Sequence, residues 1–275
     1  MIKRMIPLVT MLVLLSSCTL LQDIQEAAPY PDGRAALAPN FTVITWNVAK
    51  GNESSDEEVT EVLKTLSDSH TSAVIALQEA TGKMLDLPGR GAHFARSFRW
   101  WWGDTDSGVA LIAPVAPLTA RPITVKKREL GFATPKMGLA AVYPLSGNDG
   151  TPHRILMITL HGLNFEISAR GLAAQMAAIR EVVSAFRGPA VVCGDFNTWS
   201  TRRIAVVTEA LPGFTEAPVQ GGRPGTSRLV ALIGGNSKLA IDRIFYRGLH
   251  LEGPATAVPT TLSDHVPVMA RFTLP

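Results

Sequence analysis

The chain contains several short apolar runs, each joined directly to polar residues. Runs of this kind, bounded by polar and turn-forming residues, are typical of buried β-strands. Because several of them carry polar residues in the same relative place, we expect these residues to converge at one end of a sheet system. The runs are Phe41–Trp46 followed by Asn47, Ala73–Leu77 followed by Gln78 and Glu79, Arg154–Leu160 followed by His161, Pro189–Cys193 followed by Gly194 and Asp195, Ile241–Tyr246 containing Asp242, and Val266–Ala270 preceded by Asp264 and His265.

Two other segments have the pattern of amphipathic helices. Ser55 and Glu58 form a capping-box pattern ahead of apolar residues at helical spacing. Ser168 opens a longer helix through Phe186, with an apolar stripe that includes Leu172, Met176, Ile179 and Val183. Further strand-like runs cover Gly108–Ala113, Ile123–Val125 and Leu139–Tyr143. Many strands and few helices predict an α/β fold with two mixed sheets packed face to face and covered outside by helices.

The N-terminus has the pattern of a bacterial export signal. Two basic residues, Lys3 and Arg4, precede the apolar stretch Ile6–Leu15, which is too short to span a bilayer as a helix. The stretch ends in Leu15-Ser16-Ser17-Cys18, which resembles a lipobox, the motif whose cysteine is acylated. Thr19 rather than aspartate follows this cysteine, a pattern that indicates the outer membrane of the cell envelope. The alternative is an ordinary secretory signal with an incidental cysteine.

Three parts of the chain follow from these patterns. Residues 1–17 are predicted to be a lipoprotein signal peptide, and residues 18–39 to be the lipidated Cys18 with a flexible tether. Residues 40–275 are predicted to form one domain. Cys193 is then the only remaining thiol, so an intrachain disulfide is excluded, and its apolar surroundings indicate a small buried hydrophobic residue.

Charge gives little information about the partner. The chain has 26 basic and 23 acidic residues, and removal of Lys3 and Arg4 with the signal leaves a net charge of only +1. Residues 121–203 hold 11 basic against 5 acidic residues, which suits a phosphate-bearing substrate or an ordinary solvated surface equally. The glycine-rich stretch 220–236 is predicted to be a loop near a site. Trp100-Trp101-Trp102 is favoured as core, with base stacking or membrane contact as the alternative.

The segment Gly194-Asp195-Phe196-Asn197 is the most informative one for chemistry. Its carboxylate and amide stand at alternate positions behind a buried run, where both side chains point the same way. That arrangement suits the holding and deprotonation of a water beside a phosphate. The alternative is a strand-to-loop turn in which Asp195 and Asn197 bond their own backbone.

Together these motifs resemble the endonuclease/exonuclease/phosphatase superfamily, which includes deoxyribonuclease I, abasic-site endonucleases, neutral sphingomyelinases and inositol phosphatases. The resemblance covers residues 41–273. It implies a four-layer sandwich of two mixed β-sheets flanked by helices, and a hydrolase that uses Mg²⁺ or Mn²⁺. Oxygen ligands suit such ions, and zinc is disfavoured because no cluster of cysteine and histidine at zinc spacing exists in the sequence.

The resemblance also implies roles for individual residues. Glu79 and Asp264 are the expected metal ligands, with Asn47 nearby. Asp195 is expected to orient or deprotonate the attacking water, and Asn197 to fix the phosphate or that aspartate. Asp242 should pair with His265 and hold its tautomer. His161 is the expected contact to the phosphate or the leaving oxygen.

Four further residues have two open interpretations each. Glu129 and Lys136 are candidates for an acid partner of His161 and a phosphate clamp, or are exposed charges. Arg202 and Arg203 either contact phosphate or form the polar first turn of a helix. Asn164 is a candidate for a second polar contact beside His161.

The sequence therefore predicts a divalent-metal-dependent phosphoesterase anchored by lipid to the bacterial envelope. A phosphodiesterase acting on DNA or RNA is the first choice. A phospholipid or sugar-phosphate phosphoesterase is the second, and a catalytically silent envelope binding protein is the alternative of another class. The sequence offers no basis for naming a protein partner.

Overall fold

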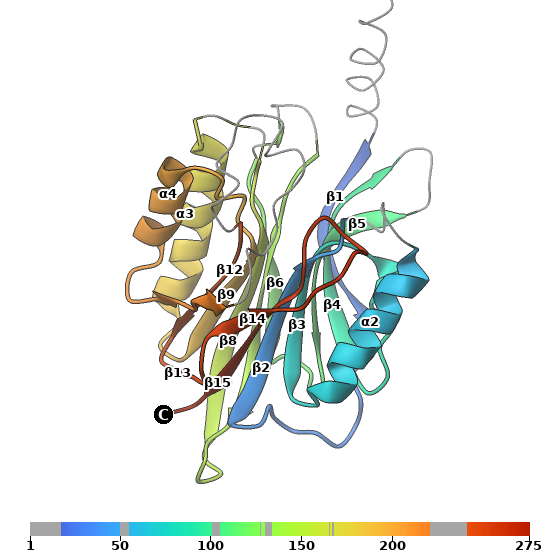
Figure 1. Ribbon diagram of the computed structural model, residues 1–275, viewed down its shortest axis with the longest axis vertical. Coiled ribbons are helices and arrows are strands. Elements are labelled where there is room, and N and C mark those ends of the chain that lie inside the picture. Colours follow the sequence, from blue (N-terminus) through green and yellow to red (C-terminus); the bar gives the residue numbers. More distant parts are fainter. Residues whose placement is uncertain are drawn as a thin grey trace, which may run out of the picture.

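The computed structural model describes residues 18–49, 55–100, 105–126, 128–129, 134–164, 166, 168–220 and 241–275. Within these residues, two β-sheets pack face to face and helices cover their outer faces (Figure 1). Among the described residues, no helix combines the length and apolarity that a membrane crossing requires. The fold predicted from the sequence is confirmed.

The first sheet, called sheet A here, has the strand order β1-β4-β5-β3-β2-β15-β14-β11, with β13 paired to β15. Its strands are β1 (Cys18–Ala28), β2 (Asn40–Asn47), β3 (Ala73–Thr81), β4 (Gly91–Trp100), β5 (Asp106–Ala113), β11 (Val219–Gln220), β13 (His250–Leu251), β14 (Ala255–Ala257) and β15 (Val268–Thr273).

The second sheet, called sheet B here, has the order β10-β12-β9-β8-β7-β6. Its strands are β6 (Thr119–Ile123), β7 (Gly138–Ser146), β8 (Pro152–His161), β9 (Ala190–Asp195), β10 (Thr215–Glu216) and β12 (Asp242–Arg247). The predicted strand Ile123–Val125 is therefore placed too late in the chain, because β6 ends at Ile123.

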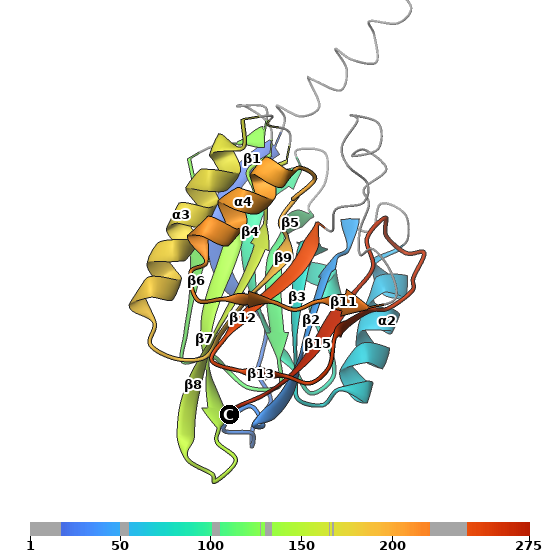
Figure 2. The same ribbon diagram turned by 60° about the vertical axis from the view of Figure 1, so that its left-hand side comes forward.

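Helix α2 (Asp56–Ser69) packs on sheet A, whereas α3 (Arg170–Ala185) and α4 (Thr201–Ala210) lie side by side on sheet B (Figure 2). A short 3-10 turn, η3 (Gly82–Met84), follows β3. The capping box of α2 is confirmed: the Glu58 amide donates to Ser55 Oγ at 3.2 Å, and the Ser55 amide donates to Glu58 Oε2 at 2.9 Å. Helix α3 begins two residues later than predicted, since Ala169 before it has a left-handed φ of 54°.

Alternation along the strands produces the layers. In β2, Val43 packs between the two sheets, and its neighbour Ile44 packs against α2 on the outer face. In β9, Val191 and Cys193 face the other sheet, and Val192 faces the helices. Burial on both faces explains why these strands read as continuous apolar runs.

The topology explains why the polar residues converge. Strands β2 and β3 are parallel, as are β8 and β9, so all four finish at the same end of their sheets. Strand β12 runs antiparallel to β9 and β15 antiparallel to β2, so the segments before β12 and β15 start at this end as well. We call it the active-site end.

The structure corrects the prediction of a tether over residues 18–39. Cys18–Ala28 forms β1, which pairs antiparallel with β4 at the edge of sheet A. The sequence pattern was obscured because β1 carries irregularities between Leu20 and Asp23 and between Glu26 and Ala28, which interrupt the alternation of its side chains. The folded domain therefore begins at β1 rather than at residue 40.

Candidate active site

The strand registers place the predicted catalytic residues beside one another. In sheet B, Asp195 lies directly across from His161 on β8 and from Asp242 on β12. In sheet A, Asn47 at the end of β2 lies across from Gln78 on β3, so Glu79 is one residue further on. The two sheets present these groups to each other across the active-site end.

Asp195 is at the centre of this arrangement and is only 2% exposed. Its Oδ2 accepts hydrogen bonds from Asn47 Nδ2 at 3.0 Å and from Asn197 Nδ2 at 3.3 Å, and its Oδ1 accepts one from the Asn197 amide at 2.9 Å. Oδ2 also lies 3.6 Å from His161 Nε2 and 3.9 Å from His265 Nε2. Residues from both sheets thus hold one buried carboxylate between two imidazoles.

The backbone around Asp195 leaves little choice of residue at position 194. Gly194 has a φ of 138°, and a Cβ there would collide with the carbonyl oxygen of Leu160 on the neighbouring strand. Asn197 has a left-handed φ of 51°, and its Nδ2 also donates to Gly162 O at 2.9 Å. Such strained residues persist only where the surroundings hold them, and they cluster at functional sites.

The predicted pairing of Asp242 with His265 is confirmed. His265 Nδ1 and Asp242 Oδ2 are 2.8 Å apart, and both side chains are buried. The carboxylate therefore holds the proton on Nδ1 and leaves Nε2 facing Asp195. Ser263 fixes this segment, because its hydroxyl donates to Asn47 O at 2.8 Å and accepts from the His265 amide at 3.1 Å.

Glu79 reaches the site through a β-bulge. The pairing of β3 with β5 shifts between Gln78 and Ala80, and Glu79 has a φ of 54°. Gln78 bonds Thr159 of the opposite sheet at 2.9 Å, so an unbroken alternation would turn Glu79 away from sheet B. The bulge turns it back toward the facing sheet, where Glu79 Oε1 lies 3.2 Å from Lys136 Nζ and 3.6 Å from His161 Nε2.

Lys136 is a member of the site, not an exposed charge. Its Nζ lies 3.2 Å from Glu79, 4.0 Å from Glu129 and 3.4 Å from His161 Nδ1, and the side chain is 9% exposed. Glu129 was the candidate acid partner of His161. It forms an ion pair with Lys136 instead, and it accepts a hydrogen bond from Thr134 Oγ1 at 3.0 Å.

Burial and neighbouring charges change the pKa values of three groups. Burial raises the pKa of Asp195 to about 6, although the nearby His265 opposes this. Burial lowers the pKa of His265, but the charge and hydrogen bond of Asp242 outweigh it and raise this pKa to about 10. For Lys136, burial is likewise outweighed by Glu129 and Glu79, and its pKa is raised.

Two buried polar side chains hold the site together; the sequence pointed to Arg203 but not to Gln175. Gln175 on α3 donates to the carbonyl oxygens of Lys136 at 3.2 Å and His161 at 3.1 Å, and its Oε1 accepts from the Leu163 amide at 2.8 Å. Its place in the apolar stripe, three residues after Leu172, was the available signal. Arg203 is fully buried and donates to the carbonyl oxygens of Asn197, Leu163 and Glu166.

Arg203 therefore holds the segments that follow β8 and β9 in place and is not a phosphate contact, whereas Arg202 is exposed in the first turn of α4. The Asn164 side chain accepts a hydrogen bond from Trp199 Nε1 at 2.9 Å. Cys193 is buried, and burial raises its pKa to about 12, as expected for an inert thiol. Residues 101–102 and 221–236, and the side chain of Trp100, lie outside the described residues.

The donor set fits a hard divalent cation by its chemistry. Within the described residues, no three His, Cys, Asp or Glu side chains gather as a metal cluster. Mg²⁺ does not require one, because it keeps several waters and usually binds one or two carboxylates together with substrate phosphate. Glu79 and Asn47 lie near the ends of adjacent strands, and Asp264 Oδ1 lies 3.9 Å from His265 Nε2, which is itself 3.9 Å from Asp195 Oδ2.

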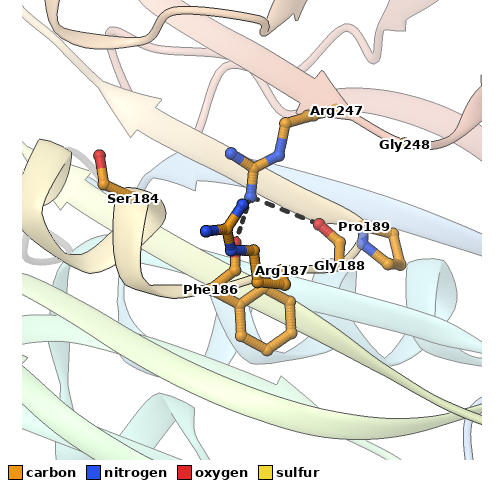
Figure 3. Close-up of a pocket in the computed structure, with 7 residues that line it drawn as sticks. All are labelled: Ser184, Phe186, Arg187, Gly188, Pro189, Arg247 and Gly248. Atoms are coloured by element: carbon orange, nitrogen blue, oxygen red, sulfur yellow. Dashed lines mark hydrogen bonds between the residues drawn. The ribbon is translucent and has the colours of Figure 1, made fainter.

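A surface pocket lies at the opposite end of sheet B and has a structural explanation. Its lining includes Phe186, Arg187, Gly188 and Arg247 (Figure 3). Arg247 donates to the carbonyl oxygens of Val183 at 3.2 Å and Phe186 at 2.9 Å, which are unpaired groups at the end of α3. The arginine thus caps a helix, and the pocket is separate from the residues that converge around Asp195.

The chain is similar to known proteins both in sequence and in fold. The chain is 31% identical over 244 residues to the UPF0294 protein of Vibrio cholerae serotype O1, covering 86% of this chain and 79% of that one. It resembles a humanised Danio rerio TDP2 with a TM-score of 0.65 at 14% identity, covering 86% and 99% of the two chains.

A mannosyl-6-phosphatase from Bacteroides thetaiotaomicron has a TM-score of 0.61 at 15% identity, covering 85% of this chain and all of that one. At these identities, both structures show the fold alone. The model of the Endonuclease/Exonuclease/phosphatase family matches residues 44–265, which include each of the strand ends that meet around Asp195. The chain belongs to this family, whose members generally hydrolyse phosphate esters and typically use divalent metal ions.

Proposed function

We propose that the protein is a divalent-metal-dependent phosphodiesterase, anchored by lipid in the bacterial envelope, with DNA or RNA as the first substrates to test. The observation that supports the chemistry is the environment of Asp195. A buried carboxylate, held by two asparagines between two imidazoles, is suited to take a proton from a water that attacks phosphorus.

Asp195 is poised for this role by its surroundings. Its pKa of about 6 leaves it mostly ionised at neutral pH and yet basic enough to accept a proton. Asn197 and Asn47 fix both of its oxygens, so the carboxylate is aligned before substrate arrives. Pre-alignment of this kind lowers the cost of reaching the transition state.

Positive charge at the site comes from the chain's own residues. With a pKa raised to about 10, His265 is a cation at neutral pH, and its Nε2 lies 3.9 Å from Asp195 Oδ2. Lys136 is a second cation, neutralised in part by Glu79 and Glu129. Donors fixed in this way stabilise the charge that develops on phosphate oxygens. His161, between Asp195 and Glu79, is placed to contact the leaving oxygen.

Glu79 and Asn47 would hold the metal ion, with Asp264 as a further candidate ligand. When bound, the ion supplies charge neutralisation at the phosphate. Binding would require Glu79 to share its carboxylate between the cation and Lys136, since Glu79 Oε1 and Lys136 Nζ are 3.2 Å apart.

The excess of basic residues within 121–203 gives less support for a polyanionic substrate than the sequence alone indicated. Two of the basic residues within 121–203, Lys136 and Arg203, are buried and bonded inside the protein. Among the fold's relatives, one TDP2 structure contains a single-strand DNA product, and another relative is a mannosyl-6-phosphatase. Nucleic acids, phospholipids and sugar phosphates are therefore the substrates to compare.

The test is hydrolysis by purified residues 19–275 of single- and double-stranded DNA, RNA, phospholipid vesicles and sugar phosphates, with Mg²⁺, Mn²⁺ or chelator. We expect metal-dependent cleavage of nucleic acid, with binding that weakens as salt rises because neutralised phosphates release counterions. Release of a lipid head group without nucleic-acid cleavage would reject the nuclease and retain the catalytic residues. Inactivity on every substrate with either metal would reject the enzyme.

A further inference from the structure

Strand β1 determines where the N-terminal end of the folded domain lies. Cys18, its first residue, pairs with Trp100 at the end of β4, and Arg99 beside it pairs with Asp106 at the start of β5. The next residue of β5, Ser107, pairs with Thr81 at the end of β3. Cys18 is therefore at the active-site end of sheet A, as the direction of β1 in Figure 1 also shows.

The registers give the approximate offset between Cys18 and the site. Three strand spacings separate β1 from β3, or about 14 Å. Along the strands, Cys18 lies a few residues further out than Glu79, on the order of 10 Å. A flexible tether of the length expected from the sequence would instead have allowed the domain to take any orientation.

Several contacts fix β1 to the domain. Arg96 on β4 pairs with Asp23 of β1 and, at 3.0 Å, with Asp106 of β5, so one guanidinium joins three strands. Ile24 packs against the core between the sheets, and Ala28 is buried. These contacts make β1 a part of sheet A and not a flexible tether.

Tyr30, two residues after the other end of β1, is fixed as well. The ring of Tyr30 lies where a Cβ of residue 91 would be, so only glycine is accommodated there. The Tyr30 hydroxyl is 2.8 Å from His93 Nδ1. Both ends of the segment 18–30 are thus attached to β4.

We propose that acylated Cys18 holds the active-site end of the domain against the lipid bilayer, so that the end of the sheets where Asp195 lies faces the membrane surface. The lipid bilayer is the partner of this end of the molecule. The proposal rests on the lipid anchor within the proposed function, and it concerns orientation, which is measured without reference to catalysis. It limits substrates to phosphate esters that are in the membrane surface or that reach it.

The experiment uses the full-length acylated protein in vesicles whose lipid head groups carry a quencher. A fluorophore is attached in turn to two cysteines that each replace an exposed arginine: Arg202→Cys at the start of α4, beside the site, and Arg154→Cys near the start of β8, at the far end. Seven residues of β8 separate Arg154 from His161, or about 23 Å. Acylation blocks the Cys18 thiol, and Cys193 is buried, so neither takes the label.

We expect stronger quenching of the label at 202 than of the label at 154. Insertion of a long Gly/Ser linker between Thr19 and Leu20 should remove the difference, and the same linker between Asp149 and Gly150, at the far end, should preserve it. Circular dichroism spectra and thermal unfolding transitions that match those of the parent verify that both insertion variants fold.

Equal quenching at 202 and 154 in the protein without a linker, or stronger quenching at 154, would overturn the proposed orientation. A Cys18 that mass spectrometry finds without lipid would overturn it too. Either result leaves the assignment of Asp195 and its partners untouched, because that assignment is tested by hydrolysis in solution.

Discussion

Replacement of Asp195 by asparagine separates catalysis from stability. The carboxylate is buried and its pKa is raised from 3.8 to about 6, so the folded protein holds it in ionised form at a cost. That difference corresponds to roughly 3 kcal/mol at neutral pH, from 1.36 kcal/mol for each tenfold change in proton affinity. The side chain amide of the Asp195→Asn variant is neutral and avoids this cost.

The variant also loses hydrogen bonds. One oxygen can still accept from the Asn197 amide, but the other position becomes an NH₂ group facing the NH₂ groups of Asn47 and Asn197. Two lost bonds to an ionised carboxylate cost about 3–6 kcal/mol together. The two contributions largely offset each other, so we expect the free energy of unfolding of Asp195→Asn to lie within about 3 kcal/mol of the parent's at pH 7.5 in chelator.

Turnover should fall far more. Loss of a general base typically costs a factor of about 10²–10⁴. The assay is hydrolysis of a soluble phosphodiester with Mg²⁺ or Mn²⁺, alongside urea unfolding at two pH values. Because the folded protein binds the Asp195 proton more tightly than the unfolded chain does, protonation of Asp195 stabilises the fold below pH 3.8, and this stabilisation is lost as the pH rises through about 6. The parent should therefore lose stability relative to the variant between these two pH values.

Near-normal turnover in Asp195→Asn would refute the mechanism. Strong destabilisation together with lost turnover would show that Asp195 serves the fold, and the catalytic assignment would fail.

Three other predictions test separate parts of the molecule. Glu79→Gln should reduce turnover on the order of a hundredfold and weaken metal binding measured by calorimetry, whereas unchanged metal affinity would exclude Glu79 as a ligand. Burial lowers the pKa of His93, so the unfolded chain binds its proton more tightly and the folded protein should lose stability as the pH falls below 6.5. His93→Gln should flatten that part of the plot of unfolding free energy against pH, and an unchanged plot would contradict a role for His93 burial. Cys18→Ala should abolish lipid labelling and leave the protein unprocessed or mislocalised, and unchanged membrane fractionation without labelled lipid would reject the lipobox.

Local sequence patterns predicted those features that local chemistry determines. The capping box of Ser55 and Glu58 needs only residues three apart in the chain. The pair of Asp242 and His265 was predicted from family resemblance, and it forms because β12 and the segment before β15 start at the same end of the sheets. Runs buried on both faces were visible as continuous apolar segments.

The remaining features depend on contacts between distant segments. The bulge at Glu79 arises from the pairing of β3 with β5, and no pattern within Ala73–Thr81 predicts it. Lys136 enters the site because Glu79 from β3 of sheet A and Glu129 from the segment between β6 and β7 meet beside it. The two interpretations of Arg203 stayed open for the same reason: its acceptors are carbonyl oxygens up to 40 residues away in the chain. Strand β1 is held by its pairing with β4 and by the side chains of Arg96 and Tyr30, and these partners could not be read from a segment that lacks a regular apolar period.

The most direct measurement of the central claim is phosphodiester hydrolysis by purified residues 19–275 with Mg²⁺, with chelator, and with Asp195→Asn. We predict turnover that requires the metal ion and falls by a factor of about 10² or more in the variant. Turnover that persists in chelator or in the variant, or a folded protein inactive on every phosphodiester offered, would contradict the proposed chemistry.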